Sequence, residues 1–505
     1  MIDRPTDLFD REQEWQDLSN FAQFRASAPS LGIVYGRRRQ GKSYLLRRAV
    51  KATGGLHVQA LEEGRSAALA RVGDAVALQR GLPKGVLQPR DWPEALHLLG
   101  SADGQAGPQR RLVVLDEFPY MLAHSPELPS ALQQFIDEAG TTSTSGNPGI
   151  VVCGSALSVM TGLLTGSRAL RGRAQLELVC KPFSLRQARQ YWGIADLHLA
   201  LVLHALIGGT PGYRDLLGDP PESLAGLGEW LARGILNPAH ALFREAEYVL
   251  AEDPRIADRS LYHSLLDAIS RGERTPSRIA GRLGRPEGAL RHPLGLLQEA
   301  GFVEKTDDVL HQRRAIWTVA DPIVRFAHLV LRPNLPQLED RRALQVWQAA
   351  QATFATQILG PHFEHQCRLW VQNCAAEELL HRPVGTVGPA TLSDAAGRAQ
   401  VDLDVVALAP AGSGPQPMPQ VVLIGEAKSG GTLRTLADLQ RLERARTLVT
   451  ATGRGDAAGA VLALFSRAGF DEALQRTAAQ RRDVALIGLP QLFGEVEQGG
   501  ASPAV

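Results

Sequence analysis

The chain has 505 residues, of which 44% are hydrophobic and 21% charged, and its formal net charge is only +1. A single hydrophobic core rarely grows this large, so we expect two to four domains in a globular protein. The balanced charge excludes a global field that draws the chain to nucleic acid or to a membrane surface, so any such contact must come from a local patch.

Cysteine usage and hydropathy indicate the compartment in which the protein works. None of the four cysteines forms a Cys-x-x-Cys pair, which argues against a zinc site or a disulfide framework and fits a reducing cytosol. No run of about 18 apolar residues exists and the N-terminus has no apolar segment, so we expect neither a membrane span nor a secretion signal. The prediction is a cytoplasmic protein with no membrane partner.

Short apolar runs alternate with helical segments in the first third of the chain. After a helical lead-in over residues 1–30, the runs lie at 31–35, 111–115 and 149–153. Short buried strands separated by helices predict a parallel α/β sheet. The pattern turns helical after residue 182 and returns to α/β from about residue 360. The later strands are expected at 401–408, 421–425, 461–465 and 484–489.

The first predicted strand runs into a glycine-rich loop that fits the pattern G-x-x-x-x-G-K-[ST]. Backbone N–H groups of such a loop turn toward phosphates, and the following helix adds its positive N-terminal end. Lys42 is expected to reach the β- and γ-phosphates of ATP, and Ser43 to ligate Mg²⁺. The predicted nucleotide-binding residues are Gly36, Arg37, Arg38, Arg39, Gln40, Gly41, Lys42, Ser43 and Tyr44. The three arginines could contact phosphate, contact a neighbouring subunit or simply be solvated.

The second apolar run ends in two acids, Asp116 and Glu117. In a P-loop sheet we expect the strand that carries such acids to lie beside the P-loop strand. Asp116 would then hold the Mg²⁺ shell, and Glu117 would orient or deprotonate the attacking water. The alternative for Glu117 is an exposed acid at the end of a strand.

The third run leads to Ser155, a candidate sensor of the γ-phosphate or of the attacking water, with a helix N-cap as the alternative. Cys153 before it is more typical of a core residue than of a reactive one. Arg168, Arg171 and Arg173 are candidates for an arginine that neutralises transition-state charge, of which Arg173 is the preferred one. Surface solvation is the competing interpretation for each arginine.

Several short motifs together resemble one family, the archaeal-type ATPases, which are prokaryotic relatives of the AAA+ and switch-type STAND NTPases. The motifs lie at residues 9–12, 35–43, 115–118, 153–155, 170–173, 182–183 and 208–211. The resemblance covers about residues 8–330 and, more loosely, the C-terminal part. Ser43 stands where the family usually has threonine. The resemblance implies an ATPase core, a helical lid and a winged helix, and in many members a C-terminal domain similar to PD-(D/E)XK (restriction-endonuclease-like) nucleases.

These implications give the expected domain layout. It comprises a P-loop ATPase core at 1–180, a helical lid at 181–254, a winged helix at 255–335, a nuclease-like domain at 336–495 and a disordered tail at 496–505. The residues between 261 and 319 follow winged-helix order, with three helices and then a hairpin. The third helix would enter a DNA major groove, whereas a regulatory lid without nucleic acid is the alternative. The basic residues of this module are Arg278, Arg282, Arg285, Arg291 and His292.

A second catalytic centre is predicted in the C-terminal part. Asp404 follows Asp402 on one face of a strand, and Glu426 and Lys428 share a face of the next. A hairpin would bring together the Asp…Glu-x-Lys set of a nuclease. Asp404 and Glu426 would hold Mg²⁺, Lys428 would polarise the attacking water, and Glu364 would add a helical acid. The alternative is a degenerate domain in which these residues form a surface salt bridge.

Three functions fit these features. The first is an ATP-driven DNA-processing protein with a linked nuclease. The second is an ATP-dependent signalling or scaffold switch whose C-terminal domain only binds a partner. The third is a DNA-binding regulator gated by nucleotide. ATP and Mg²⁺ are the expected cofactors. DNA is a candidate partner through the winged helix and the C-terminal domain, and an arginine supplied in trans would require a homo-oligomer.

Overall fold

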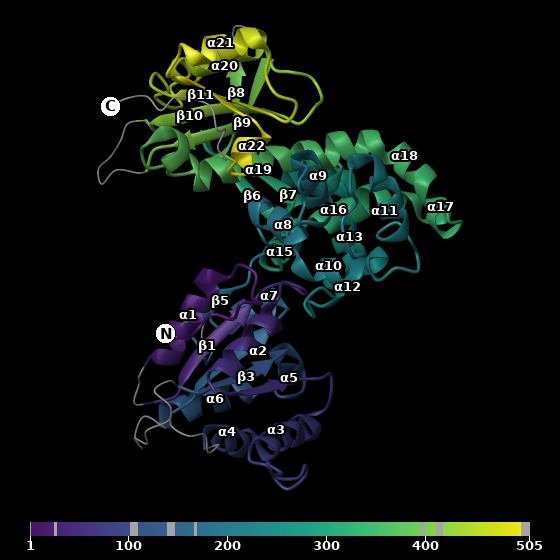
Figure 1. The fold of residues 1–505 in the computed structure, drawn as a ribbon, viewed down its shortest axis with the longest axis vertical. Helices are drawn as coiled ribbons and strands as arrows, with labels where there is room; N and C mark the ends of the chain where they lie inside the picture. The colour runs from purple at the N-terminus through teal and green to yellow at the C-terminus, as the bar shows by residue number, and fades with distance from the viewer. Residues whose placement is uncertain are drawn as a thin grey trace. The chain divides into compact units, whose positions relative to one another are not determined.

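The computed structural model describes residues 2–24, 28–101, 110–138, 147–165, 169–394, 399–410 and 418–495. Within these ranges the chain divides into two compact units (Figure 1). Unit 1 comprises Met1–Pro182 with two returning segments, Thr210–Tyr213 and Val249–Ala257. Unit 2 comprises Phe183–Gly209, Arg214–Tyr248 and Asp258–Val505. The expected tail at 496–505 and Arg168 lie outside the described residues.

Unit 1 is built on a five-stranded parallel sheet with the order β2-β3-β4-β1-β5, which is the fold class predicted from the alternating pattern. Its strands are β1 (Ser30–Tyr35), β2 (Leu56–Gln59), β3 (Leu112–Asp116), β4 (Gly149–Gly154) and β5 (Ala174–Val179). Every residue of β1, β3 and β4 is buried, because helices cover both faces of a parallel sheet.

One topological prediction is wrong. The acid-bearing strand β3 does not lie beside the P-loop strand β1, because β4 pairs in parallel with both and separates them. Sequence neighbours are often neighbours in space, but a doubly wound sheet inserts later strands between earlier ones. The acids at the end of β3 therefore lie one strand further from β1 than expected.

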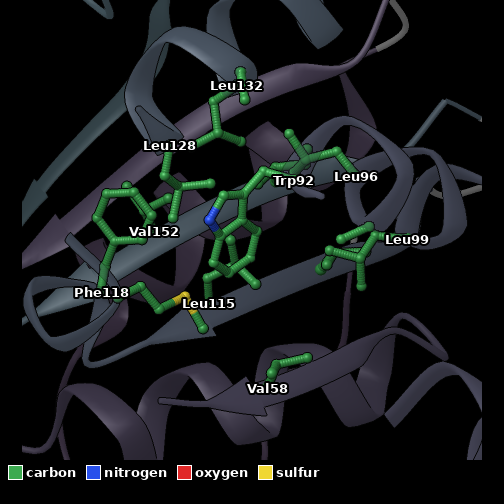
Figure 2. Close-up of a cluster of buried hydrophobic side chains, with 14 of the residues drawn as sticks. Val58, Trp92, Leu96, Leu99, Leu115, Phe118, Leu128, Leu132 and Val152 are labelled. Atoms are coloured by element: carbon green, nitrogen blue, oxygen red, sulfur yellow. The ribbon is translucent and has the colours of Figure 1, made fainter. Parts of the chain in front are cut away.

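Seven helices described in unit 1 flank this sheet: α1 (Glu12–Gln23), α2 (Lys42–Ala52), α3 (Arg65–Gln79), α4 (Trp92–Gly100), α5 (Phe118–His124), α6 (Leu128–Glu138) and α7 (Leu157–Gly162). Side chains alternate between the faces, since Val113 and Leu115 enter one core and Leu112 and Val114 the other. Figure 2 shows the first core, in which residues of α4 and α6 pack on β2, β3 and β4. The second core contains residues of α1 and α2.

The first part of unit 2 is helical. It contains α8 (Leu185–Trp192), α9 (Leu197–Ile207), α10 (Arg214–Leu217), α11 (Leu227–Arg233) and most of α12 (Glu245–Ala251). Across the described ranges no single helix has the length and apolar composition of a membrane span; α8 and α9, bent by 106°, reach them only as a pair.

Three helices and a hairpin follow in the order expected from the sequence. They are α13 (Arg259–Ser270), α14 (Pro276–Leu283), α15 (Glu287–Glu299), β6 (Val303–Asp308) and β7 (His311–Val319). The tip of this hairpin joins the next sheet, because Val309 N–H donates to Pro389 O at 3.1 Å and Thr391 N–H donates to Asp308 Oδ2 at 2.9 Å. Leu310 enters the core of that sheet. The sequence did not predict this docking.

The C-terminal part of unit 2 holds a mixed sheet with the order β12-β11-β10-β9-β8. Its strands are β8 (Val387–Asp394), β9 (Ala399–Leu408), β10 (Val421–Lys428), β11 (Val461–Ser466) and β12 (Val484–Ile487). The strands β8, β9 and β10 are antiparallel, and β10, β11 and β12 are parallel. The helices before and around the sheet are α16 (Pro322–Phe326), α17 (Leu335–Glu339), α18 (Ala343–Thr353), α19 (Gly360–Asn373), α20 (Leu436–Ala451), α21 (Glu472–Ala479) and α22 (Leu489–Leu492).

The helices α19 and α20 cover opposite faces of this sheet. Phe465 of β11 contacts Trp370 of α19, with ring centroids 6.0 Å apart, whereas the preceding Leu464 packs in the core that contains α20. One face of β9 and β10 is therefore covered by α19. Side chains on that face at the ends of the two strands lie between the sheet and the helix.

Candidate nucleotide-binding site

The loop after β1 takes a conformation that two of its glycines make possible. A Cβ atom at Gly36 would lie 2.3 Å from the carbonyl oxygen of Cys180, so only glycine fits there. Gly41 caps the N-terminus of α2 with φ 83°, in the left-handed region that favours glycine. The loop thus passes from a buried strand into the positive end of a helix, which is the arrangement that binds phosphate.

Side chains of the loop also hold its backbone. Gln40 Oε1 accepts a hydrogen bond from Arg37 N–H at 2.9 Å, and Lys42 Nζ donates to Arg37 O at 3.0 Å. Lys42 is only 5% exposed. A buried ammonium needs acceptors for its three donors. Since Arg37 O accepts only one of these bonds, the surroundings of Lys42 suit an anionic group such as phosphate.

Arg11 supports the same loop from the N-terminal segment. Its buried guanidinium donates to Gln40 O at 3.2 Å and to Lys181 O at 2.8 Å, and pairs with Glu14 at 2.7 Å. The motif at residues 9–12 carried part of the family resemblance, but no role for Arg11 was predicted from it. The geometry makes Arg11 a brace between α1, the P-loop and the segment after β5.

Of the three loop arginines, Arg38 forms an ion pair within unit 1. Its Nη1 lies 3.1 Å from Glu252 Oε1 in one of the returning segments. The backbone of Arg39 takes part as well, because Gly212 N–H in the other returning segment donates to Arg39 O at 3.0 Å. A Cβ at Gly212 would come within 2.8 Å of Arg39 Cβ, so glycine permits this approach.

Tyr44, predicted to contact the nucleotide, bonds to the N-terminal segment. Its hydroxyl lies 3.1 Å from both Asp7 O and Asp7 Oδ2, and the Arg48 guanidinium lies 3.6 Å from its ring centroid. The ring remains 41% exposed. Tyr44 therefore links α2 to the residues before α1.

Asp116 is fully buried at the end of β3. Its Oδ1 accepts from Glu117 N–H at 3.1 Å, and its Oδ2 lies 3.2 Å from Nε2 of His57 on β2. Burial by itself would raise the pKa of Asp116, but hydrogen bonds from His57, Ser43 and Cys153 outweigh burial and hold the pKa at about 2. Asp116 is therefore ionised at neutral pH and lies near Ser43, the last residue of the P-loop motif.

Glu117 has the left-handed φ of 54°, which is rare for a residue with a side chain. Such strain persists where the surrounding structure fixes it, often at functional sites. Burial raises the pKa of Glu117, and the charge of Lys42 opposes that rise. Glu117 is thus a partly buried acid near Lys42, and the interpretation as an exposed strand-end acid does not hold.

Ser155 lies beside Glu117, and its Oγ donates to Glu117 Oε2 at 3.3 Å. The alternative role as a helix N-cap is wrong, because Ala156 occupies the N-cap position of α7. Cys153 is completely buried, and burial raises the pKa of its thiol far above the usual range, in keeping with the expected core role. The sequence did not predict that this thiol would contribute to the low pKa of Asp116.

Arg173, the preferred charge-neutralising arginine, forms a two-point ion pair with Asp137 of α6. The distances are 2.9 Å from Nη2 to Oδ2 and 3.1 Å from Nε to Oδ1. Arg171 is exposed. The contacts of Arg173 thus tie the segment before β5 to α6.

The residues at the base of the P-loop fit Mg²⁺ bound together with a nucleotide. The Ser43 hydroxyl and the ionised Asp116 carboxylate supply two hard oxygen donors near each other. Magnesium commonly takes one or two protein ligands, with phosphate oxygens and water completing the octahedron.

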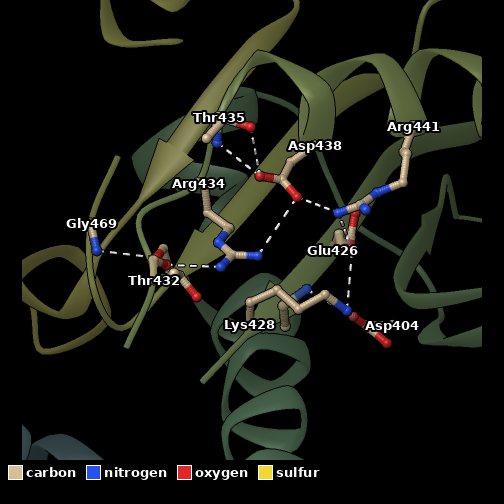
Figure 3. Close-up of polar contacts among 11 residues, drawn as sticks. Asp404, Glu426, Lys428, Thr432, Arg434, Thr435, Asp438, Arg441 and Gly469 are labelled. Atoms are coloured by element: carbon tan, nitrogen blue, oxygen red, sulfur yellow. Dashed lines mark hydrogen bonds and ion pairs between the residues drawn. The ribbon is translucent and has the colours of Figure 1, made fainter. Parts of the chain in front are cut away.

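The predicted C-terminal centre is also brought together, as Figure 3 shows. Lys428 Nζ lies 3.1 Å from Glu426 Oε1 and 3.9 Å from Asp404 Oδ2. Burial raises the pKa of Asp404 and that of Glu364 on α19, and the charge of Asp404 raises the latter further. Arg441 of α20, which the sequence did not single out, lies 3.4 Å from Glu426.

Metal binding at this second centre stays a prediction. In the described part of the chain no group of three or more histidine, cysteine, aspartate or glutamate side chains is arranged to hold a metal ion, so Asp404, Glu426 and Glu364 are not gathered as three ligands of one ion. Lys428 and Arg441 instead compensate the charge of Glu426.

Comparisons with known proteins agree with the fold of unit 1. No family model matches the sequence. The chain is 22% identical over 336 residues to an uncharacterized protein of Methanocaldococcus jannaschii. The aligned residues make up 66% of this chain and 70% of that protein. Among solved structures, a Walker-type ATPase of Pyrococcus abyssi has a TM-score of 0.51 and 21% identity, covering 64% of this chain and 97% of its own. Over that 64%, the chain has the fold of this ATPase. The ORC2 protein of Aeropyrum pernix, solved in ADPNP-ADP complexes, has a TM-score of 0.45 and 15% identity over 68% of this chain and 96% of its own.

Proposed function

We propose that the chain binds Mg-ATP at residues 36–43 and hydrolyses it. The observation that carries this proposal is the ionised Asp116, fully buried and near enough to Ser43 for this residue to help lower its pKa, beside a P-loop that holds a buried Lys42. The likeness to a protein described as a Walker-type ATPase supports it. Within the expected layout, residues 1–180 form the catalytic core.

Each residue has a separate task in this proposal. Backbone N–H groups of the loop and the Lys42 ammonium bind the phosphates, and Ser43 and Asp116 would hold Mg²⁺, which would supply positive charge beside them. Glu117 accepts the proton of the attacking water, because a buried carboxylate with a raised pKa is a better base than an exposed one. Ser155 fixes the orientation of the Glu117 carboxylate through the bond to Oε2.

ATP turnover and nucleotide binding, measured on the same variants, test this proposal. Lys42→Ala should lose binding of a fluorescent ATP analogue. Glu117→Gln should bind the analogue normally but turn over at least about 100-fold more slowly, the usual loss when a general base is removed. The rate of ATP turnover by Ser155→Ala should lie between the rates of Glu117→Gln and wild type. If the Glu117→Gln variant turns over ATP at the wild-type rate, Glu117 is not the general base.

We further propose that nucleotide controls DNA binding through the winged-helix-like module in unit 2. Arg278 and Arg282 on α14, and Arg291 and His292 on α15, are exposed, although Arg278 and Arg282 pair with nearby acids. The hairpin tip docks on β8, so DNA contact would fall to the α14–α15 face alone.

A double Arg285→Ala/Arg291→Ala variant tests this contact. Its affinity for duplex DNA should fall, and the slope of log affinity against log salt should decrease by about one for each phosphate that an arginine no longer neutralises. Arg90→Ala, an arginine of unit 1 with an 87% exposed side chain, is the matched control. Equal binding by all three proteins would place DNA contact outside the α14–α15 face, and no binding by any of them would favour a switch that contacts no DNA.

A metal-dependent nuclease is the second candidate function, and the gathering of Asp404, Glu426 and Lys428 favours it. Supercoiled plasmid, linear duplex and single-stranded DNA would be incubated with Mg²⁺ or Mn²⁺, with and without ATP. Cutting by wild type and Lys305→Ala but not by Lys428→Ala would support it. No cutting, while ATP is still hydrolysed, would favour the switch, with a C-terminal domain that binds a partner.

A further inference from the structure

His57 is a polar residue on the short strand β2, which carries no sequence motif. It lies on β2 at the end of the sheet order, and β2 pairs in parallel with β3 so that Gln59 is opposite Asp116. Leu56 and Val58 face the core that contains α3 and α4. His57 and Gln59 therefore share the other face, where Gln59 bonds to Arg47 of α2.

On this face the His57 imidazole meets the buried carboxylate of Asp116. The distance from Nε2 to Oδ2 is 3.2 Å, and the His57 side chain is only 15% exposed. In this contact Nε2 is the donor and the carboxylate oxygen Oδ2 is the acceptor. Since Oδ1 accepts from Glu117 N–H, one bond on each oxygen fixes the rotation of the carboxylate.

We propose that His57 is a positioning residue, which holds the Asp116 carboxylate in the orientation that binds the divalent cation of the nucleotide. The inference rests on the proposed binding of Mg-ATP. Carboxylates that ligate metals are generally oriented by further hydrogen bonds, and loss of such a partner typically costs about 10- to 100-fold in metal affinity. His57 sets the cation affinity of the site without touching the phosphates.

Mn²⁺ binding provides a direct test that does not depend on turnover. Free Mn²⁺ is measured by electron paramagnetic resonance while Mn²⁺ is titrated into protein with a non-hydrolysable ATP analogue. His57→Leu should raise the half-saturating Mn²⁺ concentration at least about 10-fold. His57→Gln, whose amide N–H can reach the same oxygen, should recover most of the loss. Binding of the analogue in EDTA should be equal in all proteins.

Gln59→Leu is the matched control, because it removes a polar side chain from the same strand and face without a bond to Asp116. It should bind Mn²⁺ as wild type does. Unchanged Mn²⁺ binding in His57→Leu would overturn the proposal, and so would tighter binding, which would mean that His57 competes with the cation. If His57→Leu fails to fold, His57→Asn replaces it, since the shorter amide does not reach Oδ2. Equal Mn²⁺ binding by the Asn and Gln variants would then overturn the proposal.

The failure of the underlying function has a different signature. If wild type binds no analogue with or without the cation, the nucleotide site itself is misassigned. If wild type binds the analogue and Mn²⁺ normally and His57→Leu does the same, only the role of His57 is wrong.

Discussion

At the scale of single residues, Arg11 shows how a motif outside the P-loop can control it. Its buried guanidinium holds Gln40 O and Lys181 O, and Asp10 and Arg11 both adopt left-handed φ angles of 52° and 64°. Removing one partner of a buried charged hydrogen bond costs roughly 1–3 kcal/mol or more. We expect Arg11→Ala to weaken ATP-analogue binding about 5- to 100-fold, the equivalent of that cost.

Arg11→Lys would keep the charge but cannot reach both carbonyls with one fork, so we expect only partial recovery. The neighbouring Arg4→Ala is the control, since Arg4 bonds within residues 4–12. Calorimetric titration with the ATP analogue and with ADP compares the three variants with wild type. An Arg11→Ala protein that folds and binds ADP as tightly as wild type would show that the brace does not affect the nucleotide site.

The residues of the nucleotide site were largely predictable because fixed spacing encodes them. A loop from residue 36 to 43 and two acids after an apolar run specify local geometry by themselves, and Lys42, Ser43 and Asp116 lie together as expected. His57 was not predictable, because the four residues of β2 carry no motif and their place beside β3 depends on sheet order. Ser155 was recognised, but its bond to Glu117 depends on the same order.

At the scale of elements, the contact between α9 and α19 rests on two buried histidines. His204 Nδ1 lies 2.9 Å from His362 Nε2, and both rings are nearly inaccessible. Burial lowers the pKa of His204 to about 4 and that of His362 well below its usual range, with Arg325 and His365 adding to the latter. One ring must be the donor and the other the acceptor, so the pair is stable only while it is not doubly protonated.

The sign of the pH effect follows from these directions. The unfolded chain binds protons at a pKa near 6.5, above the folded values, so stability rises with pH in the window from about 4 to 6.5 and is lost as pH falls through it. For His204 the shift corresponds to about 3 kcal/mol. Urea unfolding of unit 2 is followed at several pH values. As the pH falls, the free energy of unfolding should decrease more steeply in wild type than in His204→Leu/His362→Leu. Equal slopes would contradict this account.

The sequence did not predict β8, whose strand conformation depends on pairing with the neighbouring strand β9. The runs in β9, β10, β11 and β12 were recognised from their apolar residues, but β8 contains Gly388 and Pro389 and reads as a loop. Proline is tolerated on an edge strand because its missing N–H is not needed there. The hairpin tip at residues 308–310 bonds to this edge, and that contact joins residues about 80 positions apart in the sequence.

At the scale of the whole molecule, the two returning segments connect the nucleotide site to the chain that forms unit 2. Gly212 bonds to Arg39 O, and Glu252 pairs with Arg38, so both segments contact the P-loop. Asp253 is buried and accepts a hydrogen bond from Ser158 of α7, the helix that follows Ser155. The order of these segments should therefore depend on nucleotide, since phosphate binding fixes the loop to which they are attached.

Hydrogen exchange measured by mass spectrometry tests this dependence. A non-hydrolysable ATP analogue should slow exchange in peptides that contain residues 210–213 and 249–257 of wild type, and should leave Lys42→Ala unchanged. Glu252→Gln removes the ion pair to Arg38, so it should reduce the protection of 249–257 and spare 210–213. Surface pairs contribute little to stability, so this variant should fold normally. Protection of the P-loop without any change in either segment would mean that nucleotide binding is not transmitted along these contacts to unit 2.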